Sequence, residues 1–245
     1  GEEAQKEIFK KSGNNSVHLL IADLSSLDEV KSLAEEINNR FDKLDVLINN
    51  AGIITHQHQK TVDEYEYQFA VNYLSNFLLT HLLLDLLLKS VPSRIINVSS
   101  GAHRGVGIKF DDLQSEKEYK YLQVYGRTKL AQILFTYNLA KLLEGKGVTV
   151  NALSPGVVAT NLLSDFQGKP RSLGFLHKLR NDSPKTGAET PIYLASSEEI
   201  KNVTGKYFAN KKQEDSSMVS YDEKVGEKLW NESLKLCGIN DFGKK

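Results

Sequence analysis

Short apolar runs alternate with longer amphipathic stretches along most of this chain. We interpret the short runs, rich in Val, Ile and Leu, as strands at 17–23, 44–49, 93–99, 148–153 and 206–209. We expect helices between and after them at 27–41, 62–89, 122–144, 188–196 and 222–236. This alternation predicts an α/β fold, a Rossmann-like doubly wound parallel sheet with helices on both faces. A chain of 245 residues is expected to form a single domain, 1–245.

Polar or turn-forming residues stand at the ends of four of the predicted strands. These residues are Asp23, Asn49, Ser100 and Pro155. In open α/β sheets, ligands bind beyond the carboxyl ends of the strands. The four positions therefore predict one binding edge of the sheet.

Tyr125 and Lys129 are four residues apart on a predicted helix, so their side chains share one face. A free phenol has a pKa of about 10, and a nearby cation lowers it by favouring the phenolate. The pair could therefore exchange a proton near neutral pH. Tyr137 and Tyr207 also have lysine four residues later. The spacing gains weight only because a strand-ending serine, Ser100, and an apolar run closed by NNAG precede the first pair.

The composition excludes several other classes of protein. Lys plus Arg and Asp plus Glu both number 31, and the basic residues are scattered, so no surface for nucleic acid or anionic lipid is expected. The longest apolar stretch, Phe77–Leu88, is short of the roughly 18 residues of a membrane span, and we interpret it as a buried helix. The single cysteine, Cys237, fits a reducing, cytoplasmic setting. No acidic or Cys cluster accompanies His56 and His58, so no metal site is expected.

With these residues, the chain resembles the short-chain dehydrogenase/reductase superfamily, and within it the retinol dehydrogenase group. The superfamily likeness rests on NNAG at 49–52, Asn72, Ser100, the Tyr125/Lys129 pair and PGVVAT at 155–160. The narrower likeness rests on FDDLQSEKEY at 110–119, GKYFAN at 205–210 and LWNESLKLCGI at 229–239. The resemblance covers nearly the whole chain, from about Gly1 to Ile239.

The resemblance implies hydride transfer between a nicotinamide dinucleotide and a lipophilic alcohol or carbonyl compound. Ser100 would donate a hydrogen bond to the substrate oxygen, and Tyr125 would be the general acid and base. Lys129 would lower the pKa of Tyr125 and hold the nicotinamide ribose. Asn72 would steady a water in the proton relay, with its backbone loosened from regular helix pairing. The family pattern YxxSK has Thr128 here in place of serine, which keeps the hydroxyl.

The resemblance also implies a dinucleotide site, with the adenine amino group bound to Asp23. The remaining implied contacts, besides Tyr125 and Lys129, are Leu24, Asn50, Ala51, Gly52, Pro155, Gly156, Val158 and Thr160. We expect NADP in preference to NAD, because the group is more often associated with NADP. A homodimer through the helices at 62–89 and 122–144 is expected, since this is usual in the family. The Leu-rich stretch Leu82–Leu88 also looks broader than one core-facing stripe requires.

One feature of the family is absent from the sequence. The family opens with a strand and a glycine-rich turn, TGxxxGxG, whose N–H groups bind the pyrophosphate. The first residues here, GEEAQKEI, instead match the helix after the second strand. We therefore expect the chain to lack the first βαβ unit, whose two strands would lie between 17–23 and 44–49, and to be an incomplete copy of a longer protein.

Two rival functions and the substrate remain open at this stage. A non-catalytic Rossmann-like regulatory or binding protein would explain the missing glycine-rich turn, but it predicts loss of Ser100, Tyr125 or Lys129, and none is lost. An extended-branch epimerase or dehydratase would need a longer chain after Pro155. Apolar residues for a lipophilic ligand occur within 161–185, namely Leu162, Leu163, Phe166, Leu173, Phe175 and Leu176. They could instead seal that segment against the core, and retinoid, steroid, lipid aldehyde and xenobiotic carbonyl compounds all fit them.

Overall fold

The computed structural model of the protein describes residues 1–156 and 184–244. Within them, the strands are β1 (Val46–Asn49), β2 (Ser93–Val98), β3 (Val148–Ser154), β4 (Lys206–Ala209) and β5 (Lys212–Glu214). They form one sheet in the order β1-β2-β3-β4-β5, in which the first four strands are parallel and β5 is antiparallel to β4. The long connections between parallel neighbours contain helices, as crossover connections usually do.

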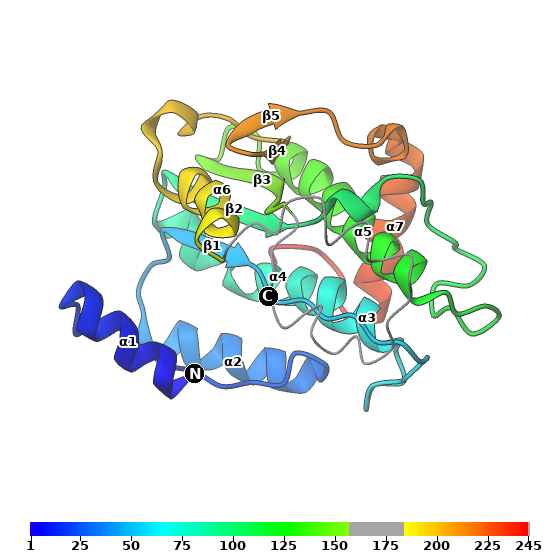
Figure 1. The fold of residues 1–245 in the computed structure, drawn as a ribbon, viewed down its shortest axis with the longest axis horizontal. Coiled ribbons are helices and arrows are strands. Elements are labelled where there is room, and N and C mark those ends of the chain that lie inside the picture. Colours follow the sequence, from blue (N-terminus) through cyan, green and yellow to red (C-terminus); the bar gives the residue numbers. More distant parts are fainter. Residues whose placement is uncertain (157–183, 245) are drawn as a thin grey trace.

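Helices lie on both faces of this sheet (Figure 1). The α-helices are α1 (Glu2–Ser12), α2 (Leu27–Arg40), α3 (Tyr67–Phe69), α4 (Ser75–Lys89), α5 (Tyr121–Leu142), α6 (Pro184–Ser196) and α7 (Glu223–Leu236). A π-helical turn, η1 (Ala70–Leu74), joins α3 to α4, and the 3-10 turns are η2 (Gly101–His103), η4 (Glu198–Ile200) and η5 (Met218–Tyr221). One face contacts α4 and α5, which are backed by α2 and α7, and the other contacts α6. The predicted Rossmann-like α/β fold is therefore confirmed.

The side chains of β2 show how the sequence pattern builds two cores. Ile95 belongs to the larger apolar cluster, which is formed mainly with α4, α5 and α7. Its neighbours Ile96 and Val98 belong to a second cluster that contains Leu194 of α6. Successive residues of a strand point to opposite faces of the sheet, so a continuous apolar run is what a strand covered on both sides needs.

The predicted strand at 17–23 is wrong, because this segment has no regular secondary structure. The pairing partner of β1 is β2, and no strand of the described residues pairs with the 17–23 segment. An extended segment without a neighbour cannot satisfy its backbone N–H and C=O groups as a strand does. Ile21 is accordingly 84% exposed, and Ile48 of the outer strand β1 is 42% exposed.

Several element boundaries differ from the sequence prediction, and one strand was not predicted. Among them, α6 begins at Pro184 instead of 188, and β1 begins at Val46 instead of 44. The helix expected from residue 62 begins at Tyr67, because Glu66 caps it by accepting from the N–H groups of Gln68 and Phe69. The strand β5 was not predicted, since all three of its residues are exposed and polar. It forms a hairpin with β4 through two residues of positive φ, Asn210 and Lys211.

The long apolar helix is mostly inside the protein. Tyr67–Lys89 is long and apolar enough by composition to cross a membrane, and 78% of its apolar window is buried in the described structure. Leu83, Leu84, Leu86 and Leu87 are buried in the larger core, and Leu82 and Leu88 pack against it. The width of this leucine surface, which suggested a dimer face, is therefore explained by packing within one chain.

Candidate active site

Ser100, Tyr125 and Lys129 come together where β2 ends against α5. The Ser99 hydroxyl donates to the carbonyl of Lys129 at 2.8 Å and so fixes the end of β2 to the helix. Ser100 follows as the cap of η2, and its side chain lies close enough to Tyr125 to affect the pKa of the phenol. The ammonium of Lys129 lies 5.6 Å from the centre of the Tyr125 ring. Tyr125 is 9% and Lys129 3% exposed, so the group is enclosed by protein.

Burial shifts the pKa values of this tyrosine and lysine toward their neutral forms. Burial raises the pKa of Tyr125 to about 12, and the hydrogen bond with Ser100 works against that shift. Burial lowers the pKa of Lys129 to about 7. The sequence predicted that Lys129 would lower the pKa of Tyr125, and the enclosed site does not show that effect. The physical reason is that the same burial that excludes water also removes much of the positive charge from Lys129.

The amine of Lys129 is held by two acceptors. It donates to the carbonyl of Val98 at 2.9 Å and to Oε1 of Gln132 at 3.0 Å. The Nε2 of Gln132 is buried without a hydrogen-bond partner in the described structure. The sequence analysis missed Gln132, although its i+3 spacing from Lys129 places both on one face of α5. Gln132 therefore orients the lysine and leaves an unused donor beside it.

Asn72 lies at the centre of the π-helical turn η1 and is fully buried. Its Oδ1 accepts from the N–H of Ile53 at 2.7 Å, and its Nδ2 donates to the Ile53 carbonyl at 3.0 Å. The same Nδ2 donates to the hydroxyl of Thr128 at 3.0 Å. Thr128 thus uses the hydroxyl that replaces the serine of the family pattern to connect Asn72 to α5. A role for Asn72 in a water relay stays a prediction.

The residues expected to hold the dinucleotide lie in three places. Asn50, Ala51 and Gly52 follow β1, and Pro155 and Gly156 follow β3, so both groups are at carboxyl ends of strands. Asp23 is exposed just before α2, where hydrogen bonds from Ser25 hold the pKa of its carboxyl below the usual value. Leu24 packs against the core. The expected contacts Val158 and Thr160, and the apolar segment 161–185 apart from its last two residues, lie outside the described residues.

Gly52 lies close to the side chains of Lys129 and Asn72. A Cβ at this position would stand 3.3 Å from Nζ of Lys129 and 3.5 Å from Oδ1 of Asn72. The backbone of the NNAG segment therefore approaches the lysine directly.

A chain of buried hydrogen bonds between amide and hydroxyl side chains connects the strands and helices that carry the site. Nδ2 of Asn49 donates to Oδ1 of Asn97 at 2.8 Å and to the Thr80 hydroxyl at 3.1 Å. Nδ2 of Asn97 in turn donates to the Thr136 hydroxyl at 2.8 Å. The chain of bonds joins β1 and β2 to α4 and α5, and because buried polar groups need partners, it fixes these four elements in one register.

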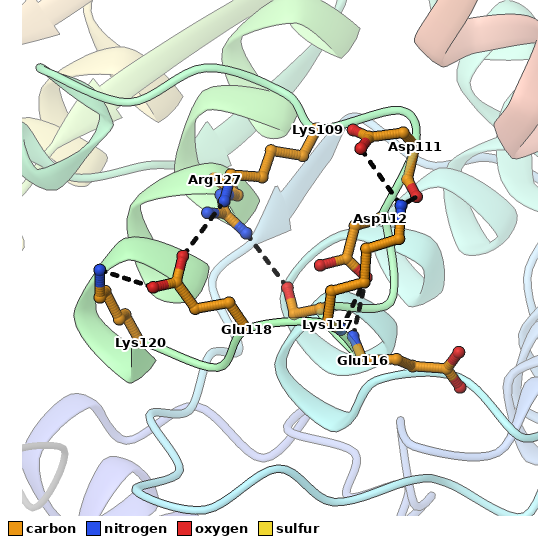
Figure 2. A network of polar contacts seen from close by, with 9 residues as sticks. Lys109, Asp111, Asp112, Glu116, Lys117, Glu118, Lys120 and Arg127 are labelled. Atoms are coloured by element: carbon orange, nitrogen blue, oxygen red, sulfur yellow. Dashed lines mark hydrogen bonds and ion pairs between the residues drawn. The ribbon is translucent and has the colours of Figure 1, made fainter.

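The segment between Ser100 and α5 is held by charged contacts (Figure 2). Glu118 pairs with Lys120 at 2.7 Å and with Lys109 at 3.5 Å. Arg127 of α5, two residues after Tyr125, donates to the Ser115 hydroxyl at 3.2 Å. The stretch FDDLQSEKEY, which carries the narrower resemblance, is therefore anchored on the helix that bears the tyrosine.

We also looked for a metal site and a cavity among the described residues. Across residues 1–156 and 184–244, no group of three or more His, Cys, Asp or Glu side chains could hold a metal ion. A cavity of about 380 Å³ lies between α5, η5 and α7, and none of the expected site residues lines it. The candidate site is therefore described by the Ser100 hydroxyl, the Tyr125 phenol and the Lys129 amine.

The comparison with known families identifies this arrangement. A model of the short chain dehydrogenase family matches residues 1–170. The chain belongs to the short-chain dehydrogenase family. Within the family, the chain is 47% identical over 225 residues to human retinol dehydrogenase 14, covering 89% of this chain and 66% of the relative. It is 42% identical over 244 residues to human retinol dehydrogenase 13, covering 97% and 74%.

A solved structure shows the same architecture. It is a protein from Beutenbergia cavernae, provisionally named an NAD(P)-dependent gluconate 5-dehydrogenase, with NADP bound at low occupancy. The TM-score is 0.66 at 26% identity, covering 85% of this chain and 80% of the other. The chain spans about two thirds to three quarters of the length of the two retinol dehydrogenases named above.

Gly52→Ala is expected to weaken dinucleotide binding with little effect on folding. The added methyl would stand 3.3 Å from Nζ of Lys129, so the amine would have to move slightly from its place. We expect a loss of about 1.4 kcal/mol of binding free energy, which is about tenfold in affinity. Isothermal titration with NADPH would measure it. Gly107→Ala is the control, because a Cβ there meets nothing within 4 Å. Equal affinity of the two variants would contradict a ligand beside Gly52.

Proposed function

We propose that the protein is an NAD(P)-dependent oxidoreductase that interconverts lipophilic alcohols and carbonyl compounds, with Tyr125 as the general acid and base. The observation that carries this proposal is the enclosed contact of Ser100, Tyr125 and Lys129 at the carboxyl end of β2. A non-catalytic binding protein has no need to keep this group together. Family membership and the two retinol dehydrogenase relatives favour the same function.

The residues divide the chemistry among themselves. The nicotinamide dinucleotide, when bound, supplies or accepts the hydride. Lys129 and the NNAG segment around Gly52 would hold its ribose, since glycine puts no side chain between this backbone and the Lys129 amine. Ser100 donates a hydrogen bond to the substrate oxygen, where negative charge develops during reduction. Tyr125 gives the proton to that oxygen in reduction and removes it in oxidation.

In this proposal, buried polar groups near Tyr125 return the proton that the phenol gives to the substrate. Lys129 lies beside the Tyr125 ring, and its lowered pKa of about 7 lets it release and recover a proton near neutral pH. Asn72 also lies beside Gly52, with its Oδ1 3.5 Å from where a Cβ of that residue would stand, and steadies a relay water in this proposal. The chain's own residues thus supply an acid, its hydrogen-bond partner and a replenishing amine.

NADP in preference to NAD is proposed for the cofactor. The supporting observation is the NADP bound to the related Beutenbergia protein, and the related retinol dehydrogenases point to a retinoid or similarly lipophilic substrate. A homodimer is proposed from family membership alone, because the leucine surface packs within one chain. A cytoplasmic setting is proposed from the single cysteine, and no nucleic-acid partner is proposed because the charges are balanced and scattered.

One experiment tests both the cofactor and the substrate class. We expect the full-length protein to reduce all-trans-retinal with NADPH at a kcat/KM at least about tenfold above that with NADH, a difference of about 1.4 kcal/mol. A small hydrophilic ketone such as dihydroxyacetone should be a poor substrate, because it leaves an apolar binding surface unfilled. Reaction with none of a panel of retinal, a steroid ketone and a long-chain aldehyde would contradict the proposed function.

A further inference from the structure

The proposed mechanism leaves one buried histidine beside the site unexplained. His103 is fully buried within η2, three residues after Ser100. Its Nδ1 lies 2.6 Å from the carbonyl oxygen of Ser100, and its Nε2 lies 3.1 Å from the backbone nitrogen of Ser217. The Tyr207 ring packs 5.0 Å away. The histidine therefore joins the turn that carries Ser100 to a segment more than a hundred residues later.

The partners of His103 fix its tautomer. A carbonyl oxygen only accepts a hydrogen bond and a backbone N–H only donates one, so Nδ1 carries the proton and Nε2 accepts from Ser217. The ring is neutral in this arrangement. The pKa of His103 is also lowered, and burial is the largest cause. His103 therefore acts through two directed hydrogen bonds.

The Ser217 side of this connection is firmly attached to α5. The hydroxyl of Ser216 hydrogen-bonds Tyr137 of α5 at 2.7 Å and Ser220 at 2.6 Å. The hydroxyl of Tyr221 accepts from the N–H of Ser216 at 3.1 Å, and its ring stacks on Tyr137. The segment 215–221 is thus fastened to the helix that bears Tyr125.

The Ser100 side has few side-chain bonds besides those of His103. The guanidinium of Arg104 donates to the Asp215 carbonyl at 2.6 Å, and the N–H of Ala102 donates to the Ser100 hydroxyl at 3.2 Å. η2 has three residues, and its backbone hydrogen bonds from the N–H groups of His103 and Arg104 are 3.2 Å long. Ser100 itself is half-buried. Loss of the bond from Nδ1 would leave the carbonyl of Ser100 with one donor, the N–H of His103 at 3.2 Å, and would leave Arg104 as the side-chain link to Asp215. The Ser100 hydroxyl would then be held less firmly relative to Tyr125.

We propose that His103 is a positioning residue for Ser100. Through its two ring nitrogens it links the Ser100 turn to the α5-anchored segment 215–221, and so sets where the Ser100 hydroxyl stands relative to Tyr125. The inference rests on the proposed function, because it assigns His103 a role only if Ser100 acts on the substrate.

The test compares His103→Phe with His103→Asn in the full-length protein. Phe keeps a buried ring and removes both hydrogen bonds, so kcat should fall between about tenfold and 10²-fold, as expected for a small misplacement of a catalytic group. The Kd for NADPH should stay within about twofold, since no proposed dinucleotide contact changes. Asn places an amide N–H where Nδ1 stands and should restore at least part of the lost kcat. Equal losses in the two variants would overturn the proposal.

A double-mutant cycle separates positioning from general destabilisation. If His103 acts through Ser100, His103→Phe should change turnover by less than about twofold in a Ser100→Ala background. The same loss in both backgrounds would overturn the proposal. If the Ser100→Ala protein has no measurable turnover, the test is whether His103→Asn has a higher kcat than His103→Phe. Full activity of Ser100→Ala would instead contradict the proposed function itself.

His81→Phe is the matched control. His81 is also buried, and its Nδ1 accepts from the N–H of Gly243, so it too connects a core helix to a distant segment. Gly243 is not one of the site residues. Its replacement should lower the thermal unfolding temperature about as much as His103→Phe and leave kcat unchanged. A comparable loss of kcat in this control would show that the His103 effect is one of stability.

Discussion

Tyr125→Phe is expected to lower kcat by about 10²–10⁴-fold, the usual contribution of a general acid or base, while the Kd for NADPH stays within about twofold. The variant removes the proton donor and its hydrogen bond with Ser100 but keeps the buried ring. The Lys129 amine keeps its bonds to Val98 and Gln132. Stopped-flow reduction of retinal and isothermal titration with NADPH would measure the two effects separately.

Tyr73→Phe is the matched control for this variant. Tyr73 is another buried tyrosine, and its hydroxyl bonds Ser233 of α7 at 2.8 Å, away from the Ser100 turn. Its pKa is also raised by burial. Loss of this hydroxyl should cost stability and leave kcat nearly unchanged. More than a few per cent of wild-type turnover in Tyr125→Phe would show that another group exchanges the proton.

The elements predicted well are those whose signal is local. Strands such as 93–98 are continuous apolar runs closed by a polar residue, and the i, i+4 spacing of Tyr125 and Lys129 places them on one helix face without further knowledge. The end of β2 then brings Ser100 to that face. Fold class and the three central residues therefore followed from patterns within a few residues of each other.

The elements predicted poorly depend on distant partners. The 17–23 run has the composition of a strand but no neighbour to pair with in the described structure. Gln132 and His103 look like ordinary helix and loop residues, and their roles come from contacts with Lys129 and Ser217. A sequence pattern specifies which residues are apolar or polar, whereas these contacts depend on how separate segments meet.

The pKa of Tyr125 shows a different kind of error. The sequence shows that Lys129 stands four residues after Tyr125. The charge of Lys129 alone would lower the pKa of the Tyr125 phenol. Enclosure of both groups changes the balance, because desolvation penalises the charged form of each. The extent of burial is a property of the packed site, so the sign of the shift could not be obtained from spacing.

Lys129→Met is expected to weaken NADPH binding and to lower kcat by about 10²-fold or more. Methionine fills a similar buried volume but cannot hold a ribose hydroxyl or return a proton to Tyr125. Both effects should appear together, because the lysine has both roles in the proposed mechanism. A loss of rate with unchanged NADPH affinity would contradict the ribose contact.

The same variant also tests the pKa of Lys129 through stability. The folded-state pKa is about 7 and the unfolded value about 10.4, so between these values the unfolded chain binds more protons. Stability contributed by this group therefore rises with pH, by up to about 1.4 kcal/mol per pH unit. Urea unfolding of wild type and Lys129→Met at pH 7, 8 and 9, without dinucleotide, would isolate this contribution, because shifts from other groups are common to both. We expect wild type to gain stability relative to Lys129→Met as the pH rises, and a constant difference would show that Lys129 is already charged in the folded site.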